Sequence, residues 1–282
     1  MNRTYLDIAR QGKNNWWRYL LGTILIIFLF LIVGSIVAGI LLVVPLANQG
    51  LSLSELSVLI EELLKTPSLQ VYLINNIPFI FFLLGIYLSV RFLHQRRFFT
   101  LVGADAKIRL PRFFQGFGVW FLILSILFVM ACVLEPQNLE FAFKPSQWFI
   151  LLACAVIVTP IQTTAEELFF RGYILQGLGL ITKQPLLLMI INGVLFMVPH
   201  LGNPEVQRGF LWMALYYFAF GVFCTLLTLK DNRLELALGI HAANNLFHIF
   251  VTTKDSAISI PAIWFVKEVG EPQWGLLWFL FE

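Results

Sequence analysis

The chain has 282 residues, of which 59% are hydrophobic and only 12% are charged. A soluble domain usually carries about 25% charged residues, and with a mean hydropathy of +0.82 this chain has too little polar surface for a water-soluble globule. The formal net charge of +3 is small, so the positions of the charges matter more than their number, and lipid is expected to surround most of the chain.

Seven apolar runs are long enough to cross the hydrocarbon core as helices, which takes about 20 residues. They lie near residues 20–46, 69–90, 113–134, 147–170, 185–201, 210–229 and 234–252. A weaker run near 258–281 is interrupted by charged residues and a proline, and is expected to be an interfacial helix or a short eighth span. The expected fold class is therefore all-α, a polytopic membrane helical bundle of seven to eight transmembrane helices.

The charged residues between these runs predict an orientation. Basic residues gather before the first run and in alternate loops: Arg3, Arg10, Lys13, Arg18, Arg91, Arg96, Arg97, Lys107, Arg109, Arg112, Lys183, Lys230 and Arg233. The positive-inside rule places these segments, and with them the N-terminus, in the cytoplasm. Because the basic segments are interrupted and flank spans, contact with anionic lipid head groups explains them better than nucleic-acid binding does. We expect a multi-pass protein of a bacterial cell membrane.

Ionisable residues inside a span are costly and mark a functional site by default. Most of them lie in the second half of the chain, near the ends of the fourth and fifth runs and within the seventh. With their motif neighbours they are Glu166, Glu167, Arg171, Phe196, His200, His241 and Asn245.

Helical geometry divides the first of these groups. Glu167 and Arg171 are four residues apart with the acid first, which favours an ion pair on one face of the helix. Glu166 points about 100° away, so it is expected to be a free carboxylate beside a structural pair.

The remaining polar residues suit the hydrolysis of an amide. Glu166 could accept a proton from water, and His200 could orient the same water or relay the proton. His241 and Asn245, four residues apart on one face, could donate hydrogen bonds to the oxyanion. No serine or cysteine accompanies a base, so attack by water is favoured over a covalent route. Singly, His200 could also be a packing residue, and Asn244 and His248 could simply bond across helices.

In this order, Glu166-Glu167-x-x-x-Arg171, Phe196-x-x-x-His200 and His241-x-x-x-Asn245 resemble the three motifs of the CPBP intramembrane endopeptidases. That family includes the type II CAAX prenyl proteases and bacterial relatives linked to bacteriocin self-immunity. The resemblance covers roughly residues 110–252.

The resemblance implies an integral-membrane endopeptidase that acts on a membrane-associated protein or peptide. It implies that Glu166 is the water-activating base, helped by His200, and that His241 and Asn245 stabilise the oxyanion. It implies supporting roles for Glu167, Arg171 and Phe196.

No cofactor is expected, because an HExxH zinc motif is absent and the family's metal-free mechanism is favoured. The alternative is a zinc ion held by Glu166, His200 and His241.

We expect one structural unit with three regions. Residues 1–110 hold a cytoplasmic segment, two spans and a basic loop; residues 111–252 form the catalytic bundle; and residues 253–282 form an interfacial or short membrane segment. Two other functions stay open: a transporter or channel with an intramembrane polar path, for which Asn75 and Asn76 are the main polar residues of the first half, and a non-catalytic immunity or scaffold protein.

The depth of His200 is a difficulty for this hypothesis. Simple topology places His200 at the far end of the fifth span, away from Glu166. Either that span is short and broken at Pro199, or the chain after Arg171 re-enters the membrane, which requires packing against protein or a cavity.

Overall fold

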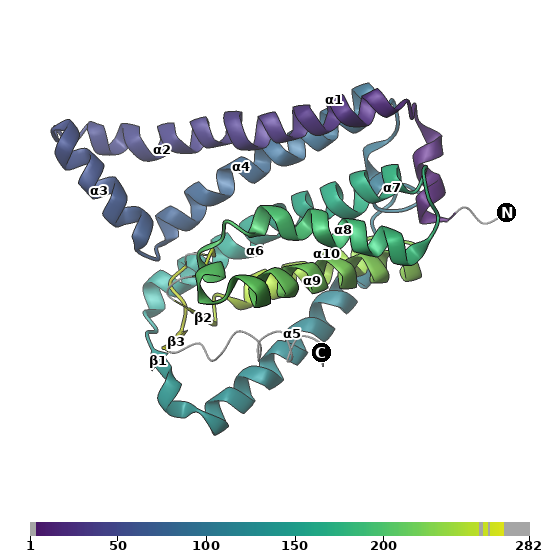
Figure 1. Cartoon of the computed structure of the whole chain (residues 1–282). Helices are drawn as coiled ribbons and strands as arrows, with labels where there is room; N and C mark the ends of the chain where they lie inside the picture. The colour runs from purple at the N-terminus through teal and green to yellow at the C-terminus, as the bar shows by residue number, and fades with distance from the viewer. Residues whose placement is uncertain (1–3, 254–255, 259, 268–282) are drawn as a thin grey trace.

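The structure, a computed structural model, describes residues 4–253, 256–258 and 260–267, and its framework is a set of long apolar helices (Figure 1). Five helices among these residues are long and apolar enough to cross a membrane. They are Trp16–Ala47 (α1 Trp16–Ile27, η2 Phe28–Gly34, α2 Ser35–Ala47), Leu69–Leu93 (α4 Leu69–Leu88, η3 Ser89–Leu93), Leu110–Leu134 (α5), Pro145–Leu178 (α6 Pro145–Glu167, η6 Leu168–Ile174, α7 Leu175–Leu178) and Phe210–Asp231 (α9).

The shorter elements connect and cap these helices. They are η1 (Tyr5–Gln11), α3 (Leu53–Lys65), η4 (Phe98–Leu101), η5 (Pro136–Asn138), α8 (Pro185–His200), η7 (Pro204–Arg208), α10 (Glu235–Phe247) and the strands β1 (Leu139–Phe141), β2 (Val251–Thr253) and β3 (Trp264–Val266). The first and second long helices lie side by side and are joined through α3 (Figure 1).

The bundle exposes large apolar side chains that only lipid can cover. On α5, for example, Leu122 is 60% exposed and Val133 73%. Such a surface would be unstable in water but is the expected lipid-facing surface of a membrane bundle. The predicted class, an all-α polytopic membrane protein, is confirmed.

The predicted number of seven to eight spans is not confirmed. The fifth run forms α8, an apolar helix of 16 residues. The seventh run forms α10, which has only 13 residues and is buried along most of its length, because its apolar side chains pack against protein and not lipid. Of the weak run near 258–281, Trp264–Val266 is a strand, and residues 268–282 lie outside the described part of the chain.

A small sheet that the sequence analysis did not predict closes one end of the bundle. Its strand order is β1-β3-β2, with β1 antiparallel and β2 parallel to β3. Because β2 follows α10 directly, the sheet ends that helix inside the bundle.

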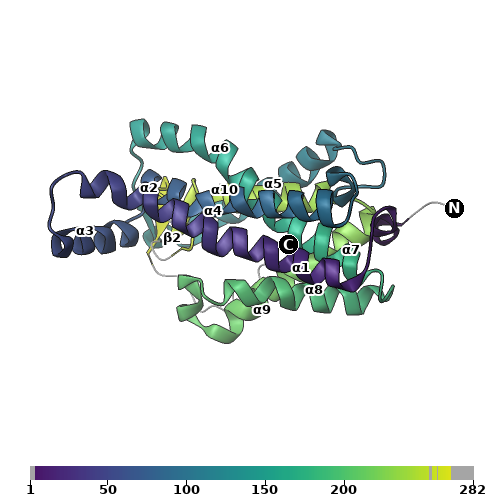
Figure 2. The same ribbon diagram turned by 90° about the horizontal axis from the view of Figure 1, so that it is seen from above.

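The position of α10 decides where the site forms. It lies between α6 and α9 (Figure 2) and packs closely on α5. A Cβ atom on Gly239 would come within 2.1 Å of the Phe113 carbonyl oxygen, and one on Gly116 within 2.4 Å of the Leu236 carbonyl oxygen. Small residues of this kind let membrane helices approach each other.

Candidate active site

The two glutamates of the first motif end α6, and a π-helical turn, η6, follows at once. Glu166 is 7% exposed and Glu167 is fully buried. A π-helical turn changes the direction of side chains within a helix and is frequent at functional sites. Here it begins at Leu168, so the two carboxylates lie where the helix changes its winding.

Glu167 connects two of the three motifs. Its Oε1 accepts a hydrogen bond from Arg171 Nη1 at 2.7 Å, and both side chains are fully buried, so the ion pair expected from the spacing is present. The same oxygen lies 2.8 Å from His241 Nδ1 on α10, a contact that the sequence analysis missed. The carboxylate therefore holds a cation of its own helix and the imidazole of another.

The Arg171 side chain also reaches the second motif. Its guanidinium lies 4.3 Å from the centre of the Phe196 ring, in the range of a cation–π contact. Phe196 is 1% exposed, and its ring is packed against those of His200 and His241. Glu167, Arg171 and Phe196 thus form a buried support behind the histidines.

Glu166 faces both imidazoles. Its Oε2 lies 3.6 Å from His241 Nε2 and 3.8 Å from His200 Nε2. These distances are too long for direct hydrogen bonds, and Oε2 is buried without a hydrogen-bond partner. A buried carboxylate oxygen in that state is free to bind another donor, such as water.

The ring of His200 is fixed on both faces. It lies 4.4 Å from the Phe196 ring and 4.6 Å from the Tyr217 ring, centre to centre. Its Nδ1 lies 2.7 Å from the Phe196 carbonyl oxygen, which can only accept, so Nδ1 carries the proton and Nε2 is the acceptor that faces Glu166. Tyr217, whose hydroxyl donates to Glu205, was not singled out from the sequence, because it lies unmarked in an apolar run.

Asn245 occupies the next turn of α10 after His241. It is 9% exposed, and its Oδ1 accepts a hydrogen bond from Asn244 Nδ2 at 3.2 Å. Asn244 Oδ1 in turn accepts a hydrogen bond from Trp120 Nε1 at 3.3 Å. His248 Nδ1 lies 2.9 Å from Thr252 Oγ1, four residues further along the chain, so this contact is local and does not cross between helices.

The start of α10 is anchored by Arg233. This side chain donates to Glu235 Oε1 at 2.6 Å and to Asp105 Oδ1 at 2.8 Å. The hydrogen bond from Arg233 lowers the pKa of Asp105 to about 2. Because His241 lies six residues after Glu235, this network sets the depth at which the imidazole meets α6.

The depth of His200 is explained by helix lengths. Glu166 lies 12 residues before the end of the long helix at Leu178, and His200 lies 15 residues after the start of α8. At 1.5 Å per residue these are about 18 Å and 22 Å, so the two side chains reach similar depths. The fifth span is short, as one of the two alternatives required, but α8 continues through Pro199. The other alternative, re-entry after Arg171, is not needed to bring the two residues together, because the chain continues as a helix to Leu178.

The described residues include no group of three His, Cys, Asp or Glu side chains arranged to hold a metal ion. The alternative zinc set of Glu166, His200 and His241 therefore finds no support in this geometry.

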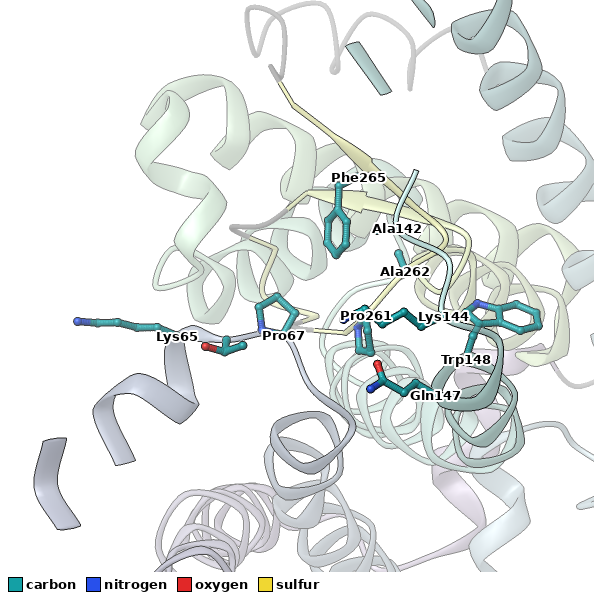
Figure 3. Close-up of a pocket in the computed structure, with 10 residues that line it drawn as sticks. Lys65, Pro67, Ala142, Lys144, Gln147, Trp148, Pro261, Ala262 and Phe265 are labelled. Carbon is teal, nitrogen blue, oxygen red and sulfur yellow. The ribbon is translucent and has the colours of Figure 1, made fainter. Parts of the chain in front are cut away.

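A cavity of about 340 Å³ lies away from these motifs, beside the first turn of α6. Figure 3 shows Trp148, Lys144 and Phe265 among its lining residues. Glu166 lies 18 residues after Trp148 on the same helix, which is about 27 Å at 1.5 Å per residue. This cavity and the motif site are therefore separate.

Comparisons with known proteins agree with the motifs. Residues 145–247 match the model of a family described as type II CAAX prenyl endopeptidase Rce1-like. This segment begins with α6 and ends with α10, so it holds all three motifs. The chain is also 35% identical over 267 residues, 94% of this chain and 87% of the relative, to the uncharacterized protein YyaK of Bacillus subtilis (strain 168). No solved structure matches.

Proposed function

Because the chain belongs to the CPBP family of intramembrane endopeptidases, we propose that it hydrolyses a peptide bond of a membrane-associated protein or peptide with water activated by Glu166. The observation that carries this proposal is the buried, unpartnered Oε2 of Glu166, which faces the Nε2 atoms of two histidines at 3.6 and 3.8 Å.

The attacking water lies between Glu166 and His200 in this mechanism. Both Glu166 Oε2 and His200 Nε2 are acceptors, so the water donates one hydrogen to each and keeps a lone pair for the substrate carbonyl carbon. As the C–O bond forms, Glu166 takes a proton from the water. It then gives that proton to the leaving amine as the C–N bond breaks.

The oxyanion of the tetrahedral intermediate needs hydrogen-bond donors of its own. Asn245 Nδ2 is one. His241 uses Nδ1 on Glu167, so it donates from Nε2 only as the imidazolium, with both nitrogens protonated. In that state the two glutamates are balanced by Arg171 and His241, which avoids an uncompensated charge in the bundle.

A covalent mechanism has less support. Among the described residues, neither His200 nor His241 hydrogen-bonds a serine, threonine or cysteine side chain, and such a pairing is what activates a nucleophile in covalent hydrolases. We therefore propose water as the nucleophile.

The surroundings of the site suit a membrane-associated substrate. The motif residues lie in a bundle whose outer surface is apolar, so the scissile bond must reach them from the bilayer or its boundary. The basic loops favour a cytoplasmic N-terminus, and we propose a bacterial cell membrane as the location.

Mass spectrometry of cell membranes tests this function. Cells producing the wild-type chain, Glu166→Gln or the control Glu62→Gln, which removes an exposed carboxylate of α3, are compared for new protein termini. We expect the same new termini in wild type and Glu62→Gln and none in Glu166→Gln. An unchanged set of termini in Glu166→Gln would reject the assignment.

A further inference from the structure

Arg96 is a buried cation just beyond the second long helix. That helix ends at Leu93, and Arg96 is only 4% exposed. The preceding residue, Gln95, has a φ of 53°, in the left-handed region that residues other than glycine rarely adopt. Strained turns of this kind cluster at functional sites, and this one precedes the residue whose side chain is turned inward.

Only part of the Arg96 guanidinium is bonded. Its Nη1 donates to Gln176 Oε1 at 2.6 Å, and Gln176 is held in place because its Nε2 donates to the Thr100 carbonyl oxygen at 3.0 Å. The Nε and Nη2 atoms of Arg96 are buried and have no hydrogen-bond partner. Together they form one edge of the planar group, the geometry that binds a carboxylate or phosphate through two parallel hydrogen bonds.

The charge of Arg96 is also uncompensated among the described residues. The groups that act on it electrostatically are the hydroxyls of Tyr19, Tyr5 and Tyr173, none of which is a carboxylate, and burial lowers the pKa of the guanidinium. A buried cation with unused donors is unfavourable unless an anion joins it. The Nε and Nη2 atoms of Arg96 are thus two buried donors without an acceptor.

The surroundings of Arg96 favour an anion at the level of the lipid head groups. Arg18 and Arg96 both act on His94, so two cations lie around one imidazole. Trp16 and Trp17, which precede Arg18 in the sequence, are exposed, as in the aromatic belt at the level of lipid head groups. Phosphate is the anion that is concentrated at this level.

The cover over Arg96 is the N-terminal segment, residues 4–13. A Cβ on Gly12 would lie 2.5 Å from the His94 carbonyl oxygen and 3.2 Å from the Arg96 side chain, so Gly12 packs directly on the arginine. Next to it, Lys13 N donates to the same carbonyl oxygen at 2.8 Å. Entry of an anion requires this end of the segment to move aside.

We propose that the Nε–Nη2 edge of Arg96 binds a phosphate group beneath the N-terminal segment. The phosphate belongs to a phospholipid head group or is the free ion, since the chemistry recognised is the same. This site is separate from the peptidase motifs and does not depend on the proposed hydrolysis.

Thermal unfolding of the full chain in a neutral detergent tests the site. One arm titrates inorganic phosphate against chloride at equal ionic strength, and the other adds phosphatidylglycerol or a neutral glycolipid with the same acyl chains. Arg96→Lys keeps the charge but loses the two-bond edge, and Arg97→Gln removes the exposed neighbouring charge as a control.

We expect a saturable rise of the midpoint with a phosphate-bearing probe in wild type and in Arg97→Gln. Arg96→Lys should need at least about tenfold more probe, because one of two charge-assisted hydrogen bonds is lost. A response to inorganic phosphate identifies the free ion, and a response to phosphatidylglycerol alone identifies the head group.

An equal response of Arg96→Lys and wild type would overturn the proposal, as would no response of wild type to either probe. If Arg96→Lys does not fold, binding to the wild type is measured directly, by phosphorus NMR for the ion and by native mass spectrometry for retained phospholipid. Absence of both would then reject the site.

Discussion

His241 Nδ1 and Glu167 Oε1 lie 2.8 Å apart, and this contact joins α10 to the end of α6. The same oxygen is bonded to Arg171, so one carboxylate orients an imidazole and neutralises a guanidinium. The contacts of Glu167 therefore extend beyond its own helix, whereas Oε2 of Glu166 has no hydrogen-bond partner.

Glu167→Gln should destabilise the protein as well as lower activity. Gln cannot balance the buried Arg171, and breaking a buried pair on one side costs about 3–5 kcal/mol. Thermal unfolding in detergent should show a clear fall of the midpoint, whereas Glu166→Gln should unfold near the wild-type temperature. A Glu167→Gln protein as stable as wild type would refute this role.

Tyr217 should act through the ring of His200. Tyr217→Phe keeps the ring that lies 4.6 Å from the imidazole and loses only the hydroxyl, so most of the activity should remain. Tyr217→Leu removes the ring and should lower kcat about tenfold, since a loosely held catalytic group is misplaced. Measured kcat and KM check this, with Tyr87→Leu, an exposed ring of α4, as the control. Equal kcat values in the Phe and Leu variants would speak against it.

His94 should make stability depend on pH. It is fully buried, with Nδ1 bonded to the Lys13 carbonyl oxygen and Nε2 to the Tyr173 hydroxyl. Burial lowers its pKa from 6.5 to about 4, so the folded state prefers the neutral ring. The free energy of unfolding is therefore at its full value above pH 6.5. It falls by up to about 3 kcal/mol as the pH falls towards 4, because the unfolded state then binds a proton that the folded state does not.

Thermal unfolding between pH 7 and 4 measures this loss. His94→Gln, which cannot titrate, should show a shallower fall than wild type over the same range. Parallel curves for the two proteins would show that His94 does not carry the effect.

Activity should be insensitive to chelators. With water activated by a carboxylate, a strong chelator followed by dialysis should leave the rate of peptide cleavage unchanged. Loss of activity that zinc restores would instead favour a metal held by Glu166, His200 and His241.

Local spacing made part of the site predictable. The ion pair between Glu167 and Arg171 follows from positions four residues apart on one helix, and so does the shared face of His241 and Asn245. The contact between Glu167 and His241 does not, because 74 residues separate them and only the packing of α10 on α6 brings them together.

Hydropathy predicted the fold class correctly but not which helices span the membrane. It identified a membrane bundle, but it cannot distinguish a helix that faces lipid from one buried in protein, so α10 was expected to be a full span. It also gave no sign of the strand Leu139–Phe141, whose partner Trp264–Val266 is distant in sequence.

The central claim is that the carboxylate of Glu166 activates water, and the cleavage rate of purified protein in lipid vesicles tests it most directly. A membrane-anchored reporter peptide is supplied to wild type and to Glu166→Gln at equal amounts of folded protein. The account predicts a rate at least about 10²-fold lower for Glu166→Gln, the usual effect of losing a general base. A Glu166→Gln protein that cleaves at the wild-type rate would contradict it.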